Sequence, residues 1–268
     1  MAEEQRLLPV PEGSGAARWD VDGKAILVVS DSGNAGAAIL VTLADWATQP
    51  VVIPLGEGAS DDVEGLSRAP ADYPADIVGV TSSGWLREWT ISSDSTLTLT
   101  RGPYALGEPP WSCTPTQVNC GKNYEGLCIH PAPAAGGCAG FAVSKATGVI
   151  VCLIETDDGY RVDPERTLAV VEQPDDIEPS NGWLSGCTFE AKPPHRLVVA
   201  GNLFTAMVGY HIDGYNDLET ATVTTLPWHG PLNQEALVFA DTATLISIGD
   251  TQGLGDGTSP FVRITCGR

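Results

Sequence analysis

Three short segments of the sequence place a glutamate at the start of a strand-like stretch. They read "DVEGL" at 62–66, "NYEGL" at 123–127 and "NQEAL" at 233–237, with Glu64, Glu125 and Glu235 at the same place in each. A buried strand ordinarily excludes an unpaired charge, because the carboxylate loses its hydration. Carboxylates at equivalent places in a repeated unit can converge, and clustered anionic oxygens are the ligands that a hard cation such as Ca²⁺ prefers.

The glutamates belong to a unit that occurs five times. The second strands of the unit read "KAILVVSDSGN", "ADIVGVTSSG", "GFAVSKATG", "HRLVVAGN" and "TLISIGDTQG". The third strands read "AAILVTL", "WLREWTI", "GVIVCLI", "AMVGYHI" and "PFVRITC". Their alternation and their β-branched residues predict strands, and no amphipathic helix of ordinary length competes with them.

Alignment of the repeats gives the position at which each first strand begins. The five equivalent residues are Ser14, Glu64, Glu125, Ser185 and Glu235. A four-stranded unit repeated radially is a propeller blade, so the sequence predicts an all-β, five-bladed β-propeller with four antiparallel strands per blade. We expect one domain over residues 1–268, in which residues 4–10 supply the missing fourth strand of blade five. Two separate β domains are the alternative.

The first strand of each blade would line the central axis. The aligned ring then brings three carboxylates and the hydroxyls of Ser14 and Ser185 to one level, which predicts a Ca²⁺ site; zinc would prefer nitrogen or sulfur. The next residue is Gly or Ala in every repeat, which allows close packing of the inner strands. An apolar layer two residues later would seal the axis: Ala16, Leu66, Leu127, Cys187 and Leu237. A polar layer two residues earlier is the predicted ligand-binding layer: Glu12, Asp62, Asn123, Trp183 and Asn233.

The order Ser, Glu, Glu, Ser, Glu around the ring resembles the axial calcium site of the soluble calcium-activated nucleotidases, the apyrases of the five-bladed propeller fold. The resemblance covers the repeat cores and the blade order, and it implies an axial Ca²⁺ and a hydrolase activity. The family also relies on an Asp-Asp-Arg type turn, whereas the turn here, Ser30-Asp31-Ser32-Gly33-Asn34, has no arginine. A shorter likeness, in "VVSDSGN" and "DVEGL", is to secreted phytase-like esterase propellers.

Catalytic residues are less clearly indicated than the ring. Asp31 and Asp62 are the candidate general bases for attack of water on an ion-bound substrate. The chain has no Gly-x-Ser-x-Gly elbow, P-loop or dinucleotide-binding fingerprint. Other side chains expected on the same face also fit ordinary turns: Ser32, Asn34, Ser82, Ser83, Trp85, Trp111, Lys122, Lys145, Asn202, Trp228, His229 and Asp250.

Charge and cysteine content limit the partners and the compartment. With 34 acidic and 14 basic residues the net charge is −20, which disfavours nucleic acid and anionic membranes. No apolar run is long enough to span a membrane. Seven cysteines favour an oxidising compartment, and we expect a secreted or periplasmic monomer whose leader is not in this chain. Cys113–Cys120 and Cys128–Cys138 are possible local disulfides, whereas Cys152 is expected to be a buried free thiol.

Two functions remain open at this level. The favoured one is a binding propeller, in which the axial Ca²⁺ is structural and the polar face binds a small molecule or a protein. The alternative is a calcium-dependent hydrolase of a phosphate or ester substrate.

Overall fold

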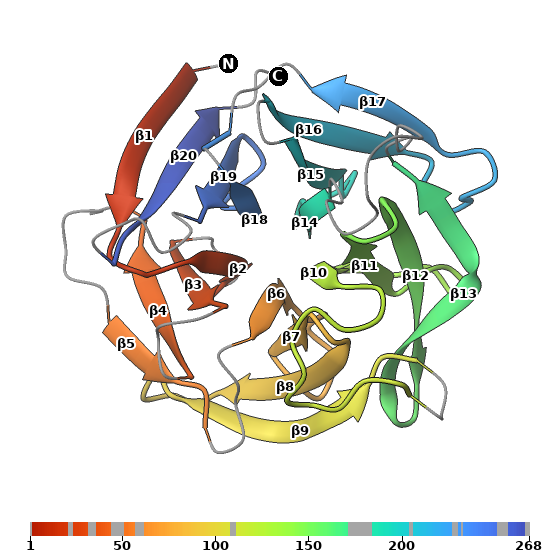
Figure 1. Cartoon of the computed structure of the whole chain (residues 1–268), viewed down its shortest axis with the longest axis horizontal. Coiled ribbons are helices and arrows are strands. Elements are labelled where there is room, and N and C mark those ends of the chain that lie inside the picture. The colour runs from red at the N-terminus through yellow and green to blue at the C-terminus, as the bar shows by residue number, and fades with distance from the viewer. Residues whose placement is uncertain are drawn as a thin grey trace.

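The described strands form a ring of five four-stranded antiparallel sheets around a central axis (Figure 1). The computed structural model describes residues 2–20, 24–31, 36–43, 51–56, 62–107, 111–170, 184–203, 206–226, 230–231, 233–250 and 257–265. The predicted five-bladed β-propeller is therefore confirmed, and two separate β domains are excluded as its description.

Each blade begins with a short inner strand and runs outward. Blade one contains β2 (Gly13–Arg18), β3 (Ala25–Ser30), β4 (Ala37–Thr42) and β5 (Val51–Pro54). Blade two contains β6 (Val63–Arg68), β7 (Ile77–Thr81), β8 (Trp85–Ile91) and β9 (Leu97–Ala105). Blade three contains β10 (Tyr124–Ile129), β11 (Gly140–Ser144), β12 (Val149–Thr156) and β13 (Gly159–Ala169). Blade four contains β14 (Leu184–Phe189), β15 (Leu197–Leu203), β16 (Ala206–Asp213) and β17 (Thr222–Leu226).

The last blade is completed by the N-terminal strand. It contains β18 (Gln234–Phe239), β19 (Thr244–Gly249), β20 (Ser259–Thr265) and, outermost, β1 (Ala2–Leu8). β1 pairs antiparallel with β20, which confirms the predicted closure, with the strand two residues nearer the N-terminus than expected. Each inner strand also contacts the inner strand of the next blade, and β18 contacts β2, so the ring is closed. Joining the two ends of the chain in one sheet removes an edge that could otherwise pair with another molecule.

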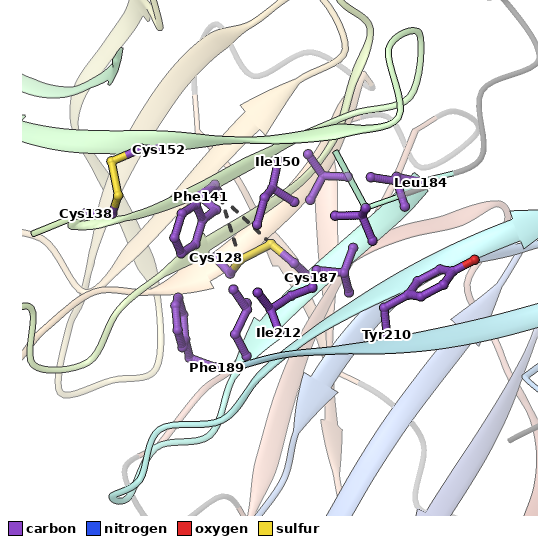
Figure 2. Close-up of a cluster of buried hydrophobic side chains, with 14 residues drawn as sticks. Cys128, Cys138, Phe141, Ile150, Cys152, Leu184, Cys187, Phe189, Tyr210 and Ile212 are labelled. Atoms are coloured by element: carbon purple, nitrogen blue, oxygen red, sulfur yellow. Dashed lines mark hydrogen bonds between the residues drawn. A yellow bond between two sulfur atoms is a disulfide. The ribbon is translucent and has the colours of Figure 1, made fainter. Parts of the chain in front are cut away.

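The hydrophobic core lies between neighbouring blades, where the face of one sheet packs against the next. The cluster between blades three and four contains Phe141, Ile150, Leu184, Phe189 and Ile212 (Figure 2). Each sheet is covered on both faces by its neighbours, so successive side chains of a strand point into two different clusters. This explains why the second strands are apolar along their whole length.

The cysteine pairing differs from the predicted one in two places. The local disulfide Cys113–Cys120 is present as predicted. Cys128 pairs with Cys187 rather than Cys138, and this bond joins the inner strands of blades three and four (Figure 2). Cys138 instead pairs with Cys152, so the prediction of a free thiol at Cys152 is wrong.

The pairing was missed because inner strands from adjacent blades lie side by side, and a linear sequence does not show this proximity. Three disulfides indicate a protein that folds in an oxidising environment. Within the described residues, no helix is of a length and apolarity that would let it cross a membrane.

Candidate functional site

A β-bulge occurs at the aligned position of every inner strand. In blade three, Tyr124 and Gly126 pair with the consecutive residues Ser144 and Val143, so Glu125 is the extra residue. The same shift in register occurs at the other four aligned positions: Ser14, Glu64, Ser185 and Glu235. A bulge leaves the extra residue out of the ladder and redirects its side chain. The five-fold repetition of this defect therefore places the predicted ring residues together on the axis.

A glycine follows the bulge in four of the five blades, and it allows the inner strands to approach one another. A Cβ added to Gly65 would lie 2.5 Å from the backbone nitrogen of Leu127 in the next blade. A Cβ on Gly126 would lie 2.7 Å from the Cα of Gly186. These are backbone contacts that cannot yield easily, so the predicted packing role of the glycines is confirmed.

All three ring glutamates are buried, and two of them form ion pairs with Lys145. Glu64, Glu125 and Glu235 are each less than a tenth exposed. The ammonium nitrogen of Lys145 lies 3.1 Å from Glu125 Oε2 and 4.0 Å from Glu235 Oε1. Lys145 directly follows β11, so the turn between the second and third strands of blade three carries a cation into the ring. Lys145 is one of the residues that the sequence predicts on this face.

Burial raises the pKa of each ring glutamate. For Glu64 the nearby carboxylates, first that of Glu125, raise the pKa further. For Glu125 and Glu235 the ammonium of Lys145 opposes the effect of burial, but the net pKa of each remains above its ordinary value. Burial lowers the pKa of Lys145, but the glutamates outweigh this and hold it above its ordinary value. The lysine is therefore charged at neutral pH, and the carboxylates compete for it.

The two ring serines have different surroundings. Ser14 donates a hydrogen bond from its hydroxyl to the carbonyl oxygen of Val63 at 2.7 Å, which ties blade one to blade two. Ser185 Oγ is fully buried and has no hydrogen-bond partner in the part of the chain that the structure describes, and the same holds for Glu235 Oε2 and Asn123 Oδ1. These three oxygens come from blades four, five and three. Buried acceptors without donors are rare in proteins and point to a missing bound species such as water or an ion.

A second polar ring surrounds the first on the same end of the axis. In each blade, one residue of the second strand pairs with the residue that precedes the bulge, and the next residue along the chain belongs to this second ring. The five residues are Asp31, Ser82, Lys145, Asn202 and Asp250. In three blades the backbone N–H of this residue donates to the carbonyl oxygen of the residue two before the bulge, namely Glu12, Asn123 or Asn233. We call the two rings together the acidic end of the axis.

Those three acceptor residues have left-handed backbone conformations. Their φ angles are 45° for Glu12, 46° for Asn123 and 49° for Asn233. Asparagine tolerates this region better than most residues, whereas glutamate does so only at a cost. The conformation closes the loop onto the second strand immediately before the bulge. The polar layer predicted two residues before the ring therefore also has a backbone role.

Hydrogen bonds join the two rings in blades four and five. Asn202 Nδ2 donates to Asn233 Oδ1 at 2.5 Å and lies 3.4 Å from Glu235 Oε1. Asn233 Nδ2 in turn donates to Asp250 Oδ2 at 2.8 Å. The chain of amides fixes the orientation of Asn233 and leads from the exposed rim to the buried glutamate.

Asp62, one of the two predicted general bases, is held in place by hydrogen bonds from Ser82. The hydroxyl of Ser82 lies 2.9 Å and 2.8 Å from its two carboxylate oxygens, and Ser82 Oγ accepts the N–H of Asn119. Burial raises the pKa of Asp62 to about 6, against the opposing effect of the hydrogen bonds from Ser82. Asp31 is close enough to Glu64 and Glu235 to raise the pKa of both. The structure thus brings both predicted bases beside the ring.

Other predicted residues have structural contacts or lie outside the described residues. The indole N–H groups of Trp85 and Trp111 donate to the carbonyl oxygens of Cys113 and Ser83, which holds the loop around 111–120 against blade two. Lys122 is exposed. The remaining predicted residues fall outside the described part of the chain: Ser32, Asn34, Trp183, Trp228 and His229.

The donor set at the acidic end suits a hard cation. Its accessible atoms are carboxylate, hydroxyl and amide oxygens, which are the ligands of Ca²⁺. A cavity of about 10 Å³ on the axis is lined by the ring residues and the apolar layer, and this is room for about one water molecule. Within the described residues no three His, Cys, Asp or Glu side chains form a group that could hold a metal ion as they lie. Lys145 is the cation that the structure places among them.

The sequence predicts the ring and a lysine on the same face, but neither the bulge nor the ion pair of Lys145 with Glu125. The bulge could have been suspected from the glycine that follows the acid, because glycine in a strand often marks one. The position of Lys145 against Glu125 depends on the pairing of β10 with β11, and no local pattern indicates it.

The fold and this site define a five-bladed β-propeller with an acidic axial centre. The chain matches no protein-family model and no curated protein. Among solved structures, the PQQ-bound aldose sugar dehydrogenase from Streptomyces coelicolor aligns with a TM-score of 0.49 and 14% identity, over 98% of this chain and 98% of that chain. A candidate glucose dehydrogenase from Thermus thermophilus aligns with a TM-score of 0.43 and 12% identity, over 97% of this chain and 100% of that chain. Similarity at this level assigns neither a family nor an activity.

Proposed function

We propose that this protein is a ligand-binding propeller of an oxidising compartment, secreted or periplasmic, in which an axial Ca²⁺ is a structural part of the binding face. The supporting observation is a set of buried oxygens to which the described residues supply no donor: Ser185 Oγ, Glu235 Oε2 and Asn123 Oδ1, from three consecutive blades. A cation bound there would satisfy acceptors that no protein group satisfies.

The residues that would hold the ion are those of the ring, Ser14, Glu64, Glu125, Ser185 and Glu235. When bound, the ion would supply positive charge that offsets the mutual repulsion of the glutamates and links all five inner strands. The pairing of Lys145 with Glu125 reduces the charge available to the ion, so we expect weak affinity. Dissociation constants of 10⁻⁴–10⁻³ M are typical of extracellular calcium modules.

The ligand itself would bind above the ring, at the predicted polar layer of Glu12, Asp62, Asn123 and Asn233, together with Trp183. The second ring adds carboxylates at Asp31 and Asp250 and an amide at Asn202. A surface with this charge favours a small molecule or a protein segment that is neutral or basic, and it disfavours polyanions. We expect the protein to act as a monomer.

Calcium titration of chelator-treated protein tests the proposal. Calorimetric titration is expected to give one binding event, and CaCl₂ is expected to raise the melting temperature. Glu235→Gln should weaken binding at least about tenfold, as loss of one anionic ligand implies. Glu190→Gln is the matched control, because Glu190 is equally buried but pairs with Arg196 far from the ring. Absence of any heat up to millimolar CaCl₂, with melting unchanged by a chelator, would contradict the proposal.

A second candidate function is calcium-dependent hydrolysis of a phosphate or ester, as the resemblance to the apyrases implies. The observation that favours it is the placement of Asp62, a buried carboxylate held by Ser82 beside the ring. The absence of the family's arginine turn counts against it. Wild type, Glu125→Gln and Asp62→Asn should be assayed on nucleoside triphosphates, nucleoside diphosphates and activated esters. Turnover that requires calcium and is lost in both variants would establish this function in place of pure binding.

A further inference from the structure

The end of the axis opposite to the glutamates carries two arginines. Four residues after the aligned position, each inner strand ends at the other side of the ring, about 13 Å away at 3.3 Å per residue. The residues there are Arg18, Arg68, Ile129, Phe189 and Phe239. Arg18 and Arg68 come from neighbouring blades, and both line a pocket with a volume of about 40 Å³. We call this pocket the arginine end of the axis.

The two arginines are not equivalent. Arg68 donates to the carbonyl oxygen of Trp19 at 2.7 Å and forms an ion pair with Asp76 at 2.8 Å. Arg18 has neither a hydrogen bond nor an ion pair with any residue in the described part of the chain. Five guanidinium N–H donors are therefore left at the rim of a pocket, although a partly buried charge normally has a partner.

The electrostatic surroundings of Arg18 leave its charge uncompensated. Burial lowers the pKa of Arg18, and repulsion from Arg68 lowers it further, while Asp20 raises it only in part. Asp20 Oδ1 already accepts the backbone N–H of Lys24. Glu190, a buried acid that follows the inner strand of blade four, is paired with Arg196. None of the described residues that line the pocket is acidic.

The remaining walls of the pocket are mainly apolar. They are formed by side chains of the other blades, among them Ile129, Phe189 and Val238. The hydroxyls of Ser67 and Thr188 also line it, but each already accepts a backbone N–H, from Ile129 and Phe239. The pocket therefore offers, beside an apolar wall, the guanidinium of Arg18, which has no partner among the described residues, and that of Arg68, which is already paired. Its volume corresponds to about three water molecules, at 10–15 Å³ each.

We propose that the arginine end is a binding site for a small monocarboxylate, with Arg18 holding the carboxylate and the apolar wall receiving a short alkyl group. A carboxylate matches the planar fork of a guanidinium through two parallel hydrogen bonds. A phosphate carries more charge and more acceptors than one free guanidinium satisfies. The apolar layer of Leu66, Leu127 and Leu237 lies between this pocket and the glutamates, so the inference does not rest on the proposed function.

Titration with acetate, propionate and inorganic phosphate tests the site. Sodium salts are added at constant ionic strength with NaCl as the reference, and binding is followed by calorimetric titration and by the melting temperature. Wild type is expected to bind propionate most tightly, then acetate, with phosphate weakest. Arg18→Gln should weaken propionate binding about tenfold or more, and Arg18→Lys should give an intermediate loss, because lysine keeps the charge but loses the fork.

The control variant is Arg6→Gln, which removes a charge of the same kind from an exposed position on β1, the outermost strand of blade five. It should bind propionate like wild type. Arg18→Gln is expected to fold, with a melting temperature in NaCl at or above that of wild type, because it removes a partly buried charge without a partner. Phosphate binding as tight as propionate binding, equal losses in Arg6→Gln and Arg18→Gln, or no carboxylate binding to wild type would each overturn the proposal. Calcium titration of Arg18→Gln should be unchanged, which separates this result from that of the acidic end.

Discussion

At the acidic end of the axis, three glutamates project from β-bulges, and two of them, Glu125 and Glu235, share the ammonium of Lys145. At the arginine end, the same five strands are in regular register, and Arg18 lies beside an apolar wall. The acidic end is held by the ion pairs of Lys145 and a chain of amide hydrogen bonds. The half toward the arginines is held by apolar packing and by the Cys128–Cys187 disulfide. One strand can thus present opposite chemistry at its two ends, because a single inserted residue changes which side chains face the axis.

The two ends also differ in how their buried charges can be compensated. The glutamates are buried close together, so binding of a proton or a cation can reduce the repulsion between their carboxylates. Arg18 cannot lose its proton at physiological pH, so only binding of an anion can compensate its charge. The acidic end is therefore expected to respond to pH and to cations, and the arginine end to anions.

The largest effect is expected from Lys145→Met at the acidic end. Removal of one partner from a buried ion pair costs about 3–5 kcal/mol, because the remaining charge is left uncompensated. We expect a loss of this size in the free energy of urea unfolding at pH 8. Lys122→Met, on the same face but exposed, should change stability by no more than about 0.5 kcal/mol. Equal stability of the two variants would show that the ion pair does not hold this end.

Disulfide removal compares covalent links in the two halves of the ring. Cys128→Ser with Cys187→Ser opens a bond between residues 59 apart in sequence and is expected to cost about 4 kcal/mol. Cys113→Ser with Cys120→Ser opens a bond across a separation of 7 and should cost about 2 kcal/mol. Thermal unfolding of both double variants measures the difference. A larger loss in the second variant would mean that the loop near the acidic end matters more than the link between blades.

The glycines between the two ends are expected to come next. Gly65→Ala introduces a Cβ 2.5 Å from the backbone of the neighbouring strand and should cost about 3 kcal/mol, as overpacking does. Gly136→Ala is the control: its φ of 75° also disfavours alanine, but no atom lies within 4 Å of the added Cβ. The control should lose about 1–2 kcal/mol in chemical unfolding. A smaller loss in Gly65→Ala than in the control would contradict close packing of the inner strands.

The smallest predicted effect is on the pH dependence of stability. His130 follows β10 at the arginine end; its ring contacts Phe189 and His195, and its Nε2 lies 3.0 Å from the hydroxyl of Tyr215. Burial, followed by repulsion from His195, lowers the pKa of His130 to about 4. The unfolded state then binds more protons between pH 6.5 and 4, so this contribution is present above pH 6.5 and is lost on acidification.

His130→Gln removes this titration. Relative to the variant, wild type should lose about 2 kcal/mol of unfolding free energy between pH 8 and pH 5. Asp62, whose raised pKa acts with the opposite sign, is present in both proteins and cancels in the difference. Parallel pH profiles for the two proteins would show that His130 does not titrate in this range. A profile that diverges with the opposite sign would require a protonated histidine in the folded state.

Most of the fold was predictable because it repeats. Apolar second strands recur five times, each after a first strand whose aligned residue is followed by Gly or Ala. Such a pattern depends only on residue type and on spacing along the chain. The ring positions followed from the same alignment. The partners of Cys128 and Cys152 were not predictable, since they depend on which strands of different blades become neighbours.

The sequence by itself determined the number of blades, the closure by the N-terminal strand, the five residues of the ring and the need for glycine beside them. These features depend on residue type and on spacing along the chain. Only the tertiary structure decided that each ring residue is a bulge and that Lys145 reaches Glu125. It also decided that Arg18 lies at a pocket with no partner among the described residues, while Arg68 has one. Charges and cysteines act over distances of a few ångströms in space, and residues far apart along the chain reach such distances only when the ring closes.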